Sequence, residues 1–206
     1  MDAAAAAALI PHGATVGMSG FTGAGYPKAL PQAIAERAQA EHAQGRPYKI
    51  NLWTGASTAP ECDGALAQAH AIGQRLPFNT DPLARQQINA GEIDFIDMHL
   101  SHVAQHAWFG FFGKMNVAVI EVLGVTADGL LIPSTAIGNN KTWLEIADQV
   151  ILEVNTKLPG AMEGMHDIYY GTAIPPRRMP ISMTHADNRI GEPYLKVDPA
   201  KVIAVV

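Results

Sequence analysis

The sequence predicts an α/β fold, in which a mainly parallel sheet is covered by helices on both faces. Two observations support this class. Apolar segments typical of strands alternate with segments of helical periodicity, and glycine- or proline-rich turns separate them. Strands that are joined through helices run parallel and are buried on both faces. The chain has 206 residues, of which 48% are hydrophobic, and this is enough for one domain with a substantial core.

The chain begins with a short alanine run and then a strand–loop–helix unit. Residues 3–8 are all alanine, with no basic region before them, so we expect the tail of a helix rather than a signal peptide. Residues 14–19 predict a buried strand, and residues 28–44 predict a helix that Gly-Arg-Pro at 45–47 ends. The apolar residues that give the helical spacing are Ala29, Leu30, Ala33, Ile34 and Ala38.

The remaining elements follow from the same two periodicities. Strands are expected at residues 48–54, 95–98, 116–122, 130–133, 149–154 and 202–206, and helices at 62–72, 83–90, 101–108 and 142–147. The Asp128-Gly129 turn predicts that segment 130–133 runs antiparallel to the strand before it. Residues 157–194 are rich in proline and have no clear period, so we expect loops there, and the final apolar segment closes the sheet.

The composition argues against several classes of partner. The net charge is −5 and no run is rich in lysine or arginine, so neither nucleic acid nor an anionic membrane surface is expected as a partner. No stretch approaches the roughly 18 apolar residues that a membrane-spanning helix needs. Cys62 is the only cysteine, which excludes a disulfide within the chain and fits a reducing, cytoplasmic location. We expect Cys62 to be a semi-buried loop residue rather than a nucleophile.

A glycine-rich loop at residues 19–28 joins the first strand to the first long helix. Gly20, Gly23 and Gly25 allow tight turns that expose backbone N–H groups, and the start of the helix adds partial positive charge. This combination suits an anion such as a carboxylate or a phosphate. The spacing of a dinucleotide-binding loop and the lysine of a P-loop are both absent. The alternative is a tight turn without a binding role.

Three loops are expected at the carboxyl edge of the sheet, where ligands of such folds collect. They are residues 19–26, 55–60 and 134–140. In the second loop, Ser57 and Thr58 lie beside Gly55, and hydroxyl and N–H groups can hold a small carboxylate. Thr80 offers another donor. The alternative is that Ser57 and Thr58 cap a helix that starts near residue 60. The Gly-x-Ser-x-Gly elbow of many hydrolases is absent around Ser57.

Three further groups have both a chemical and a structural interpretation. His99, His102 and His106 share a helical face, but no carboxylate or cysteine motif accompanies them, so an interface or solvated face is favoured over a metal site. The aromatic cluster at 108–112 suggests core or a subunit contact first, and an acyl-chain pocket second. The polar residues Glu163, His166 and Asp167, within segment 163–167, favour a hydrogen-bonded loop over acid–base machinery.

Five segments occur in a fixed order: residues 19–28, 54–60, 77–81, 88–91 and 163–167. Together they resemble the amino-terminal half of the acetyl-CoA hydrolase/transferase family, whose best-known members are succinyl-CoA:acetate CoA-transferases. The resemblance covers nearly the whole chain. It implies a CoA-transferase (NagB/RpiA-like) fold, coenzyme A as a substrate and no metal, with Ser57 and Thr80 lining a carboxylic-acid pocket. Ala59 departs from the glycine that is common before this loop's proline.

The resemblance also implies a mechanism in which the nucleophile lies outside this chain. In the family, a glutamate of the carboxy-terminal half attacks the acyl-CoA thioester, forming an acyl-glutamyl anhydride and free CoA thiolate. The thiolate then forms a glutamyl-CoA thioester, which a second carboxylate collects. Entry of water in place of that acid gives hydrolysis. We therefore expect no catalytic residue here, and expect this chain alone to be inactive.

These expectations amount to one amino-terminal domain over residues 1–206, without the carboxy-terminal catalytic domain. Its expected partners are short acyl-CoA and carboxylic acids, the carboxy-terminal half or a second subunit, and further copies in a homo-oligomer. The alternative function is a non-catalytic subunit or truncated paralogue that binds a carboxylate or CoA-like ligand. A following coding segment with the family's glutamate would distinguish them. The expected substrate-binding residues are Ser57, Thr58, Thr80, Gly23, Gly25 and Gly55.

Overall fold

The computed structural model describes residues 1–57, 59–172 and 176–206, and its core is one large α/β sheet. Within these residues the sheet has eight strands in the order β10-β9-β7-β1-β3-β5-β6, with β8 paired to β7. All neighbours along the path are parallel, which confirms the predicted class. In the described ranges, no helix combines the length and apolar character needed to cross a membrane.

The chain builds the sheet outward from β1 in two directions. The first strands extend one side: β1 (Thr15–Met18), β3 (Ile50–Trp53), β5 (Ile72–Leu76) and β6 (Asp94–Phe95). The later strands extend the other: β7 (Val117–Val125), β9 (Gln149–Val154) and β10 (Val202–Val205). The short β8 (Leu131–Pro133) runs antiparallel to β7 after the predicted turn, in which the Thr126 N–H donates to the Leu130 carbonyl at 2.8 Å. The final apolar segment forms the edge strand β10, as expected.

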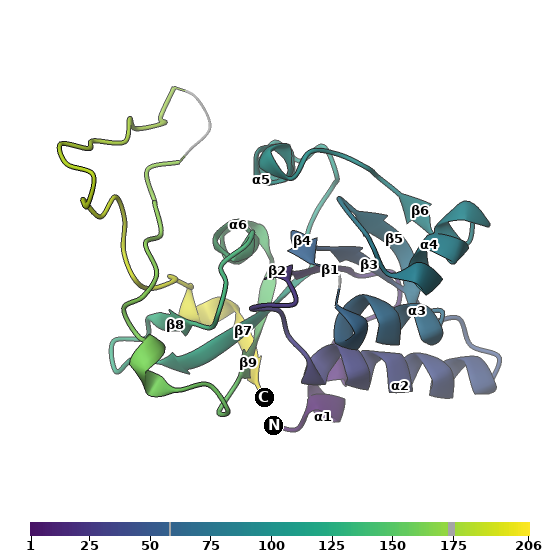
Figure 1. Ribbon diagram of the computed structural model, residues 1–206. Helices are drawn as coiled ribbons and strands as arrows, with labels where there is room; N and C mark the ends of the chain where they lie inside the picture. Colours follow the sequence, from purple (N-terminus) through teal and green to yellow (C-terminus); the bar gives the residue numbers. More distant parts are fainter. Residues whose placement is uncertain (58, 173–175) are drawn as a thin grey trace.

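Helices cover both faces of the sheet, as predicted (Figure 1). Successive residues of β7 point to opposite faces, so Val117 and Val119 pack in one core while Ala118 and Ile120 pack in the other. The first core includes residues of α1 (Ala3–Ala8), α2 (Ala29–Ala43), α3 (Ala65–Gln68) and α4 (Pro82–Asn89). The second includes residues of α5 (Leu100–Trp108) and α6 (Asn140–Ile146).

The alanine run forms a short helix, α1, as expected, and in the described chain Asp2 caps its start. The Asp2 carboxylate accepts a hydrogen bond from the Ala5 N–H at 2.7 Å, which satisfies a free donor at the start of α1. Ala6 and Ala7 are fully buried, and α1 packs against α2. Small side chains therefore allow the two helices to approach closely. The Met1 amino group also donates to the Val205 carbonyl at 2.7 Å, which places the two ends of the described chain side by side (Figure 1).

The prediction of a single helix at residues 62–72 was wrong. A five-residue π-helix, η1 (Pro60–Gly64), leads directly into α3, and β5 begins at Ile72. The strand was missed because Gln74 and Arg75 interrupt its apolar pattern. Arg75 is fully buried, since its guanidinium forms a two-point ion pair with the equally buried Asp63. The two bonds are Nε–Oδ1 at 2.8 Å and Nη2–Oδ2 at 2.9 Å.

The other differences are small. The strand expected at 95–98 is only the two-residue β6, and the remaining predicted helices and strands agree with the structure to within a few residues. Segment 157–194 has only a single turn of 3-10 helix, η2 (Gly160–Met162), among its described residues, and a second such turn, η3 (Pro199–Lys201), precedes β10. Cys62 lies in η1 and is fully buried, rather than semi-buried in a loop.

Candidate functional site

The candidate site lies where the strand order reverses direction. The chain proceeds from β1 to β3 on one side and later from β7 to β9 on the other, so β1 and β7 flank the switch point. Three loops meet there: the Ser19 Oγ accepts from the Asn139 N–H at 2.8 Å, and the Asn139 Nδ2 donates to the Thr54 carbonyl at 3.2 Å. We call residues 19–26, 54–57 and 136–139 the loop junction. The expectation that these loops share one edge is confirmed.

The predicted glycines of the loop junction have different surroundings. Gly25 has a φ of +72°, and a Cβ there would lie 2.6 Å from both the N and O atoms of Ala136. A Cβ on Gly55 would lie 2.8 Å from the Ser19 Oγ. These two glycines let the backbones of the loops pack together. Gly23 is exposed, and a Cβ there would meet no described atom within 4 Å, so its backbone has open space beside it.

A small second sheet brings Ser57 to the glycine-rich loop. Strand β2 (Phe21–Thr22) pairs in parallel with β4 (Ala56–Ser57), so that Thr22 lies opposite Ser57. Thr22 has a φ of +52°, a left-handed conformation that costs energy for a β-branched residue. Thr58 lies outside the described residues. The N-cap residue of η1 is Ala59, whose side chain cannot accept a hydrogen bond. Neither Ser57 nor Thr58 therefore occupies the capping position that the alternative interpretation gave them.

Thr80 follows the neighbouring strand. The Thr54 N–H donates to the Leu76 carbonyl at 3.0 Å, so the ends of β3 and β5 lie side by side. Thr80 itself is exposed, and its carbonyl accepts from the Arg85 Nη2 at 3.2 Å. The buried Asp63–Arg75 pair joins η1, which follows Ser57 along the chain, to the strand that leads to Thr80. Ser57 and Thr80 are thus carried by adjoining elements, and their role in a pocket stays a prediction.

The start of α2, which was expected to add positive charge to an anion site in the glycine-rich loop, is already occupied by a carboxylate of the protein itself, and the anion site in the loop stays a prediction. Glu153, from β9, accepts hydrogen bonds from the backbone N–H groups of Lys28, Ala29 and Leu30 at 2.6, 3.0 and 2.9 Å. A carboxylate in this position satisfies the free donors and the partial positive charge of the helix start. A ligand anion would therefore have to bind elsewhere in the loop junction.

Two more contacts fix the exit of the glycine-rich loop. The Lys28 Nζ lies 2.5 Å from the buried Glu121 carboxylate, which is opposite Glu153 in the pairing of β7 with β9. The Tyr26 hydroxyl donates to the Glu61 carboxylate at 2.6 Å, which ties the loop to η1. Burial first, and then this hydrogen bond, raise the pKa of Tyr26 well above its usual value, so the phenol stays neutral. The sequence held one signal for this network, namely that Glu121 and Glu153 each interrupt an otherwise apolar strand pattern.

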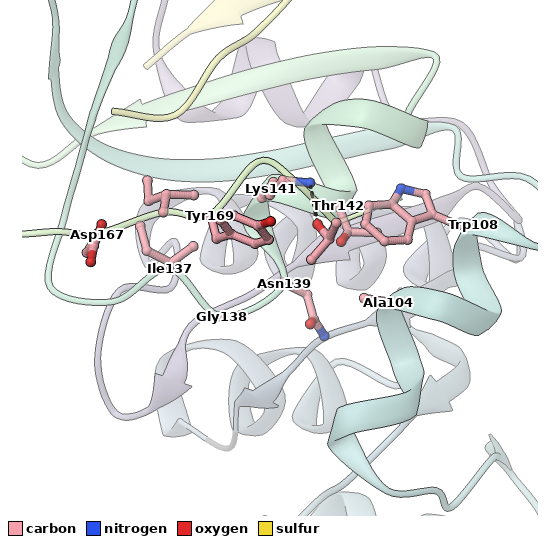
Figure 2. A pocket seen from close by; sticks show the side chains of 11 residues that line it. Ala104, Trp108, Ile137, Gly138, Asn139, Lys141, Thr142, Asp167 and Tyr169 are labelled. Carbon is pink, nitrogen blue, oxygen red and sulfur yellow. Dashed lines mark hydrogen bonds between the residues drawn. The ribbon is translucent and has the colours of Figure 1, made fainter. Parts of the chain in front are cut away.

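A pocket of about 310 Å³ opens between α5, α6 and residues 167–172 (Figure 2). Gly138 and Asn139 contribute to both this pocket and the loop junction, so the two are continuous. The Lys141 Nζ is bound to the Glu145 carboxylate at 2.7 Å and the Thr172 hydroxyl at 3.1 Å, and lies 4.8 Å from the Trp108 ring centre. None of the predicted substrate-binding residues is among the described residues that line it: Ala104, Trp108, Ile137, Gly138, Asn139, Lys141, Thr142, Asp167, Ile168, Tyr169 and Thr172.

The sequence indicated only part of this pocket. An acyl-chain pocket was the second interpretation of the aromatic cluster at 108–112, and Trp108 does line the pocket. Lys141 and Tyr169 were not predicted, because each comes from a segment whose neighbours in space lie far away in the sequence. The other aromatic residues of the cluster differ in burial. Phe112 packs on the core residue Trp53 with ring centres 5.5 Å apart, while Phe111 is exposed.

The three histidines lie on α5 and at its start, where His99 and His102 are exposed and His106 is half-buried. The ring centres of His99 and His102 are 5.9 Å apart, and those of His102 and His106 are 6.0 Å apart. They therefore share a helical face, as the spacing predicted. Among the residues that the structure describes, no group of three histidine, cysteine, aspartate or glutamate side chains could hold a metal ion.

The polar residues of segment 163–167 form a hydrogen-bonded loop, in agreement with the favoured interpretation. Asp167 accepts from the backbone N–H groups of Ile190 and Gly191 at 3.0 and 2.7 Å. Glu163 accepts from the Tyr194 hydroxyl at 2.8 Å. The His166 Nε2 lies 2.6 Å from the Ser134 carbonyl, which ties this loop to the segment that enters the loop junction.

Comparisons with known proteins give the family. Residues 1–206 match the family described as acetyl-CoA hydrolase/transferase N-terminal domain. Over 206 residues, the chain is 45% identical to the propanoyl-CoA:succinate CoA transferase of Escherichia coli, and over 201 residues 43% identical to the succinyl-CoA:acetate CoA-transferase of Clostridium kluyveri. It is 37% identical over 209 residues to the acetyl-CoA hydrolase of Schizosaccharomyces pombe.

The matched relatives are longer proteins. These alignments cover 97% or more of this chain but 42%, 37% and 40% of the three relatives, in the same order. Solved structures show the same fold. The chain resembles glutaconate coenzyme A-transferase from Acidaminococcus fermentans with a TM-score of 0.59 at 13% identity, covering 75% of this chain and 66% of that one. It resembles RipA from Yersinia pestis with a TM-score of 0.58 at 17% identity, covering 77% and 37%.

Proposed function

Because the chain belongs to the acetyl-CoA hydrolase/transferase N-terminal domain family, we propose that it supplies the amino-terminal half of a CoA-transferase or acetyl-CoA hydrolase. The family match over residues 1–206 is the observation that carries this proposal. The relatives named above are two CoA-transferases and an acetyl-CoA hydrolase, so coenzyme A esters are their substrates. For this protein we propose transfer of CoA between a short acyl-CoA and a carboxylic acid, or hydrolysis of acetyl-CoA.

The loop junction would hold the carboxylate of the free acid. Ser57 is paired beside the glycine-rich loop, Thr80 follows the adjoining strand, and the backbone of Gly23 has open space beside it. We assign carboxylate contacts to these residues and to Thr58. Hydroxyl and N–H donors to a carboxylate form the stronger, charge-assisted class of hydrogen bond. Gly25 and Gly55 serve the same site by letting the loops pack closely.

The reactive glutamate would come from the carboxy-terminal half. It attacks the thioester carbonyl and expels CoA thiolate, leaving an acyl-glutamyl anhydride. The thiolate then attacks the glutamyl carbonyl and releases the original acid, which gives a glutamyl-CoA thioester for the second acid to collect. No metal takes part in this scheme. Closure of the two halves over the loop junction would exclude water, and this exclusion separates transfer from hydrolysis.

Assays of the separate and combined halves test the proposal. We expect no steady release of thiol from acetyl-CoA with residues 1–206 alone, and activity when the polypeptide that follows in the same reading frame is added. Sustained turnover by this chain alone, absent from a heat-treated control, would contradict the proposal. An inactive mixture in which this chain still binds acetate or CoA would favour the non-catalytic alternative. We further propose a cytoplasmic, homo-oligomeric enzyme, which cell fractionation and light scattering would test.

A further inference from the structure

An extended arm, residues 177–188, projects from the body of the molecule (Figure 1). Its described residues belong to no helix or strand, yet its apolar side chains alternate as they do in a strand. Met179, Ile181 and Met183 are 64%, 50% and 58% exposed. These three exposed side chains form an apolar row along the sequence of the arm. Such a row is unfavourable in water unless something covers it.

The arm is held in place at both ends. At its start, the Met179 N–H donates to the Gly171 carbonyl at 3.0 Å, and the Tyr169 hydroxyl donates to the Met179 carbonyl at 2.8 Å. At its far end, the Asn188 side-chain oxygen accepts from the backbone N–H groups of Thr184 and His185, both at 2.9 Å, which closes a turn. Two backbone hydrogen bonds between Ile168 and Glu192 join the segments that lead into and out of the arm. These bonds give the arm a defined shape.

An open groove of about 530 Å³ separates the arm from α5. Trp108 and Ala104 line its α5 side, and Met179 and Ile181 line its arm side. Arg178 places a positive charge at the same groove. Ser182, the neighbour of Ile181, does not line this groove but lines a different pocket together with Gly191.

We propose that this groove, between α5 and the arm, receives an apolar segment of the carboxy-terminal half of the full-length protein. This inference rests on the proposed function. It names the arm and α5 as the surface by which the two halves associate. Because Arg178 lines the groove, the docking segment is expected to carry a carboxylate at that end. Methionine side chains, which adapt to irregular surfaces, suit this role.

The length of the relatives favours this occupant over a second copy of the chain. More than half of the length of each of the three relatives lies outside the matched region. A covalently attached half has an effective concentration in the millimolar range near the groove, whereas a second copy is present only at the protein's own concentration. The groove lies beside the 310 Å³ pocket and shares Ala104, Trp108, Tyr169 and Thr172 with it, so docking here would cover the candidate site.

Binding between the separately produced halves tests the proposal. The probe is the polypeptide that the same reading frame encodes after Val206, titrated into residues 1–206. We expect Ile181→Asp to weaken binding at least about thirtyfold, because it places a charge in a buried apolar contact. The matched control, Ser182→Asp, adds the same charge at a neighbouring residue that does not line the groove and should change binding less than about threefold. Circular dichroism and thermal melting establish that both variants are folded.

Hydrogen exchange supplies a second readout. Backbone amides of the arm should become protected when the second half is added, and also in the full-length protein. Equal effects of the two variants, an arm that stays unprotected in the complex, or folded halves that do not associate would overturn the proposal. Self-association that Ile181→Asp abolishes would assign the groove to a second copy instead. If the mixture is active but the arm is not protected, this inference is refuted and the proposed function stands. If the halves bind specifically through the arm but the mixture is inactive, this inference stands and the proposed function is refuted.

Discussion

At the residue scale, Glu153 determines what the glycine-rich loop can bind. Its carboxylate accepts from three successive N–H groups at the start of α2, so these donors are not free for a ligand anion. An external carboxylate must therefore rely on donors that point from the loop junction. Ser57 and Thr80 are the hydroxyl residues that follow the two adjoining strands, so their removal should affect the acid more than the thioester.

We predict that Ser57→Ala in the full-length enzyme lowers kcat/KM for the free carboxylic acid about tenfold or more. A hydrogen bond to a charged group contributes about 1.5–3 kcal/mol, which corresponds to this loss. The KM for CoA should change little, since we expect the other half to hold most of the CoA. Thr80→Ala should have the same pattern with a smaller effect, because Asn79 and backbone N–H groups lie beside it. Steady-state kinetics with each substrate varied in turn measures both.

A double His102→Ala/His106→Ala variant is the control, since neither histidine is among the residues assigned to the carboxylate. Its carboxylate kinetics should match those of the wild type. If Ser57→Ala instead lowered the Tm and left the carboxylate kinetics intact, Ser57 would have a structural role at the start of η1. The pocket assignment would then be wrong.

Cys62 gives a second residue-scale prediction, which concerns reactivity. The thiol is fully buried in η1, and burial raises its pKa well above the usual value, with the charge of Asp63 adding to the effect. Because the thiolate is the reactive form, the native protein should react with an aromatic disulfide reagent at pH 8 at least about a hundredfold more slowly than the urea-unfolded protein. Cys62 is the only cysteine, so the absorbance reports it alone. Fast labelling of the native chain would show that η1 opens readily.

At the element scale, the attachment of α2 to β9 depends on one side chain. We predict that Glu153→Gln lowers the free energy of unfolding by about 1–3 kcal/mol, because it replaces charge-assisted bonds to the helix start with neutral ones. The control Glu36→Gln makes the same chemical change on the exposed side of the same helix and should stay within about 0.5 kcal/mol of the wild type. Urea unfolding of all three proteins measures this. If Glu153→Gln were as stable as the wild type, the negative charge of Glu153 would contribute nothing to the attachment of α2.

The sequence predicted the elements whose own residues carry the pattern. Strand β7 contains Val-Ala-Val-Ile and is flanked by clear turns, so both its position and its antiparallel partner followed from local signals. Strand β5 was missed because it buries Arg75, and the Asp63 that makes this possible lies in another element. Local periodicity assigns charged residues to the surface, so it fails where a buried charge is paired across the fold.

The same distinction applies to the candidate site. That three loops share an edge follows from the order of strands and helices, and was predicted. Which groups fill those loops depends on contacts between distant residues, such as the bonds from Glu153 to the start of α2. The pocket beside Lys141 and Tyr169 likewise needs α5, α6 and the segment after Asp167 to be placed together. No local pattern in a single sequence carries that information.

At the scale of the whole molecule, two apolar surfaces lie apart from the arm. Strand β10 is the outermost strand of the sheet beside β9, and Val205 on it is exposed. At the end of α5, Phe109 is exposed and Phe111 is 71% exposed. Edge strands and exposed aromatic side chains are common sites of association, because pairing satisfies backbone groups and removes apolar area from water.

We therefore predict that residues 1–206 alone bind a hydrophobic dye and self-associate as the concentration rises. Sedimentation velocity at several concentrations should show a shift toward larger species, and Phe111→Ser should reduce both the shift and the dye fluorescence. Leu9→Ser, which changes an exposed apolar residue that belongs to neither surface, is the control and should leave both unchanged.

If the carboxy-terminal half covers these surfaces, adding it should suppress dye binding and self-association together. A clean monomer with little dye fluorescence at high concentration would show that these surfaces are tolerated in water, and would remove this argument for a covering partner.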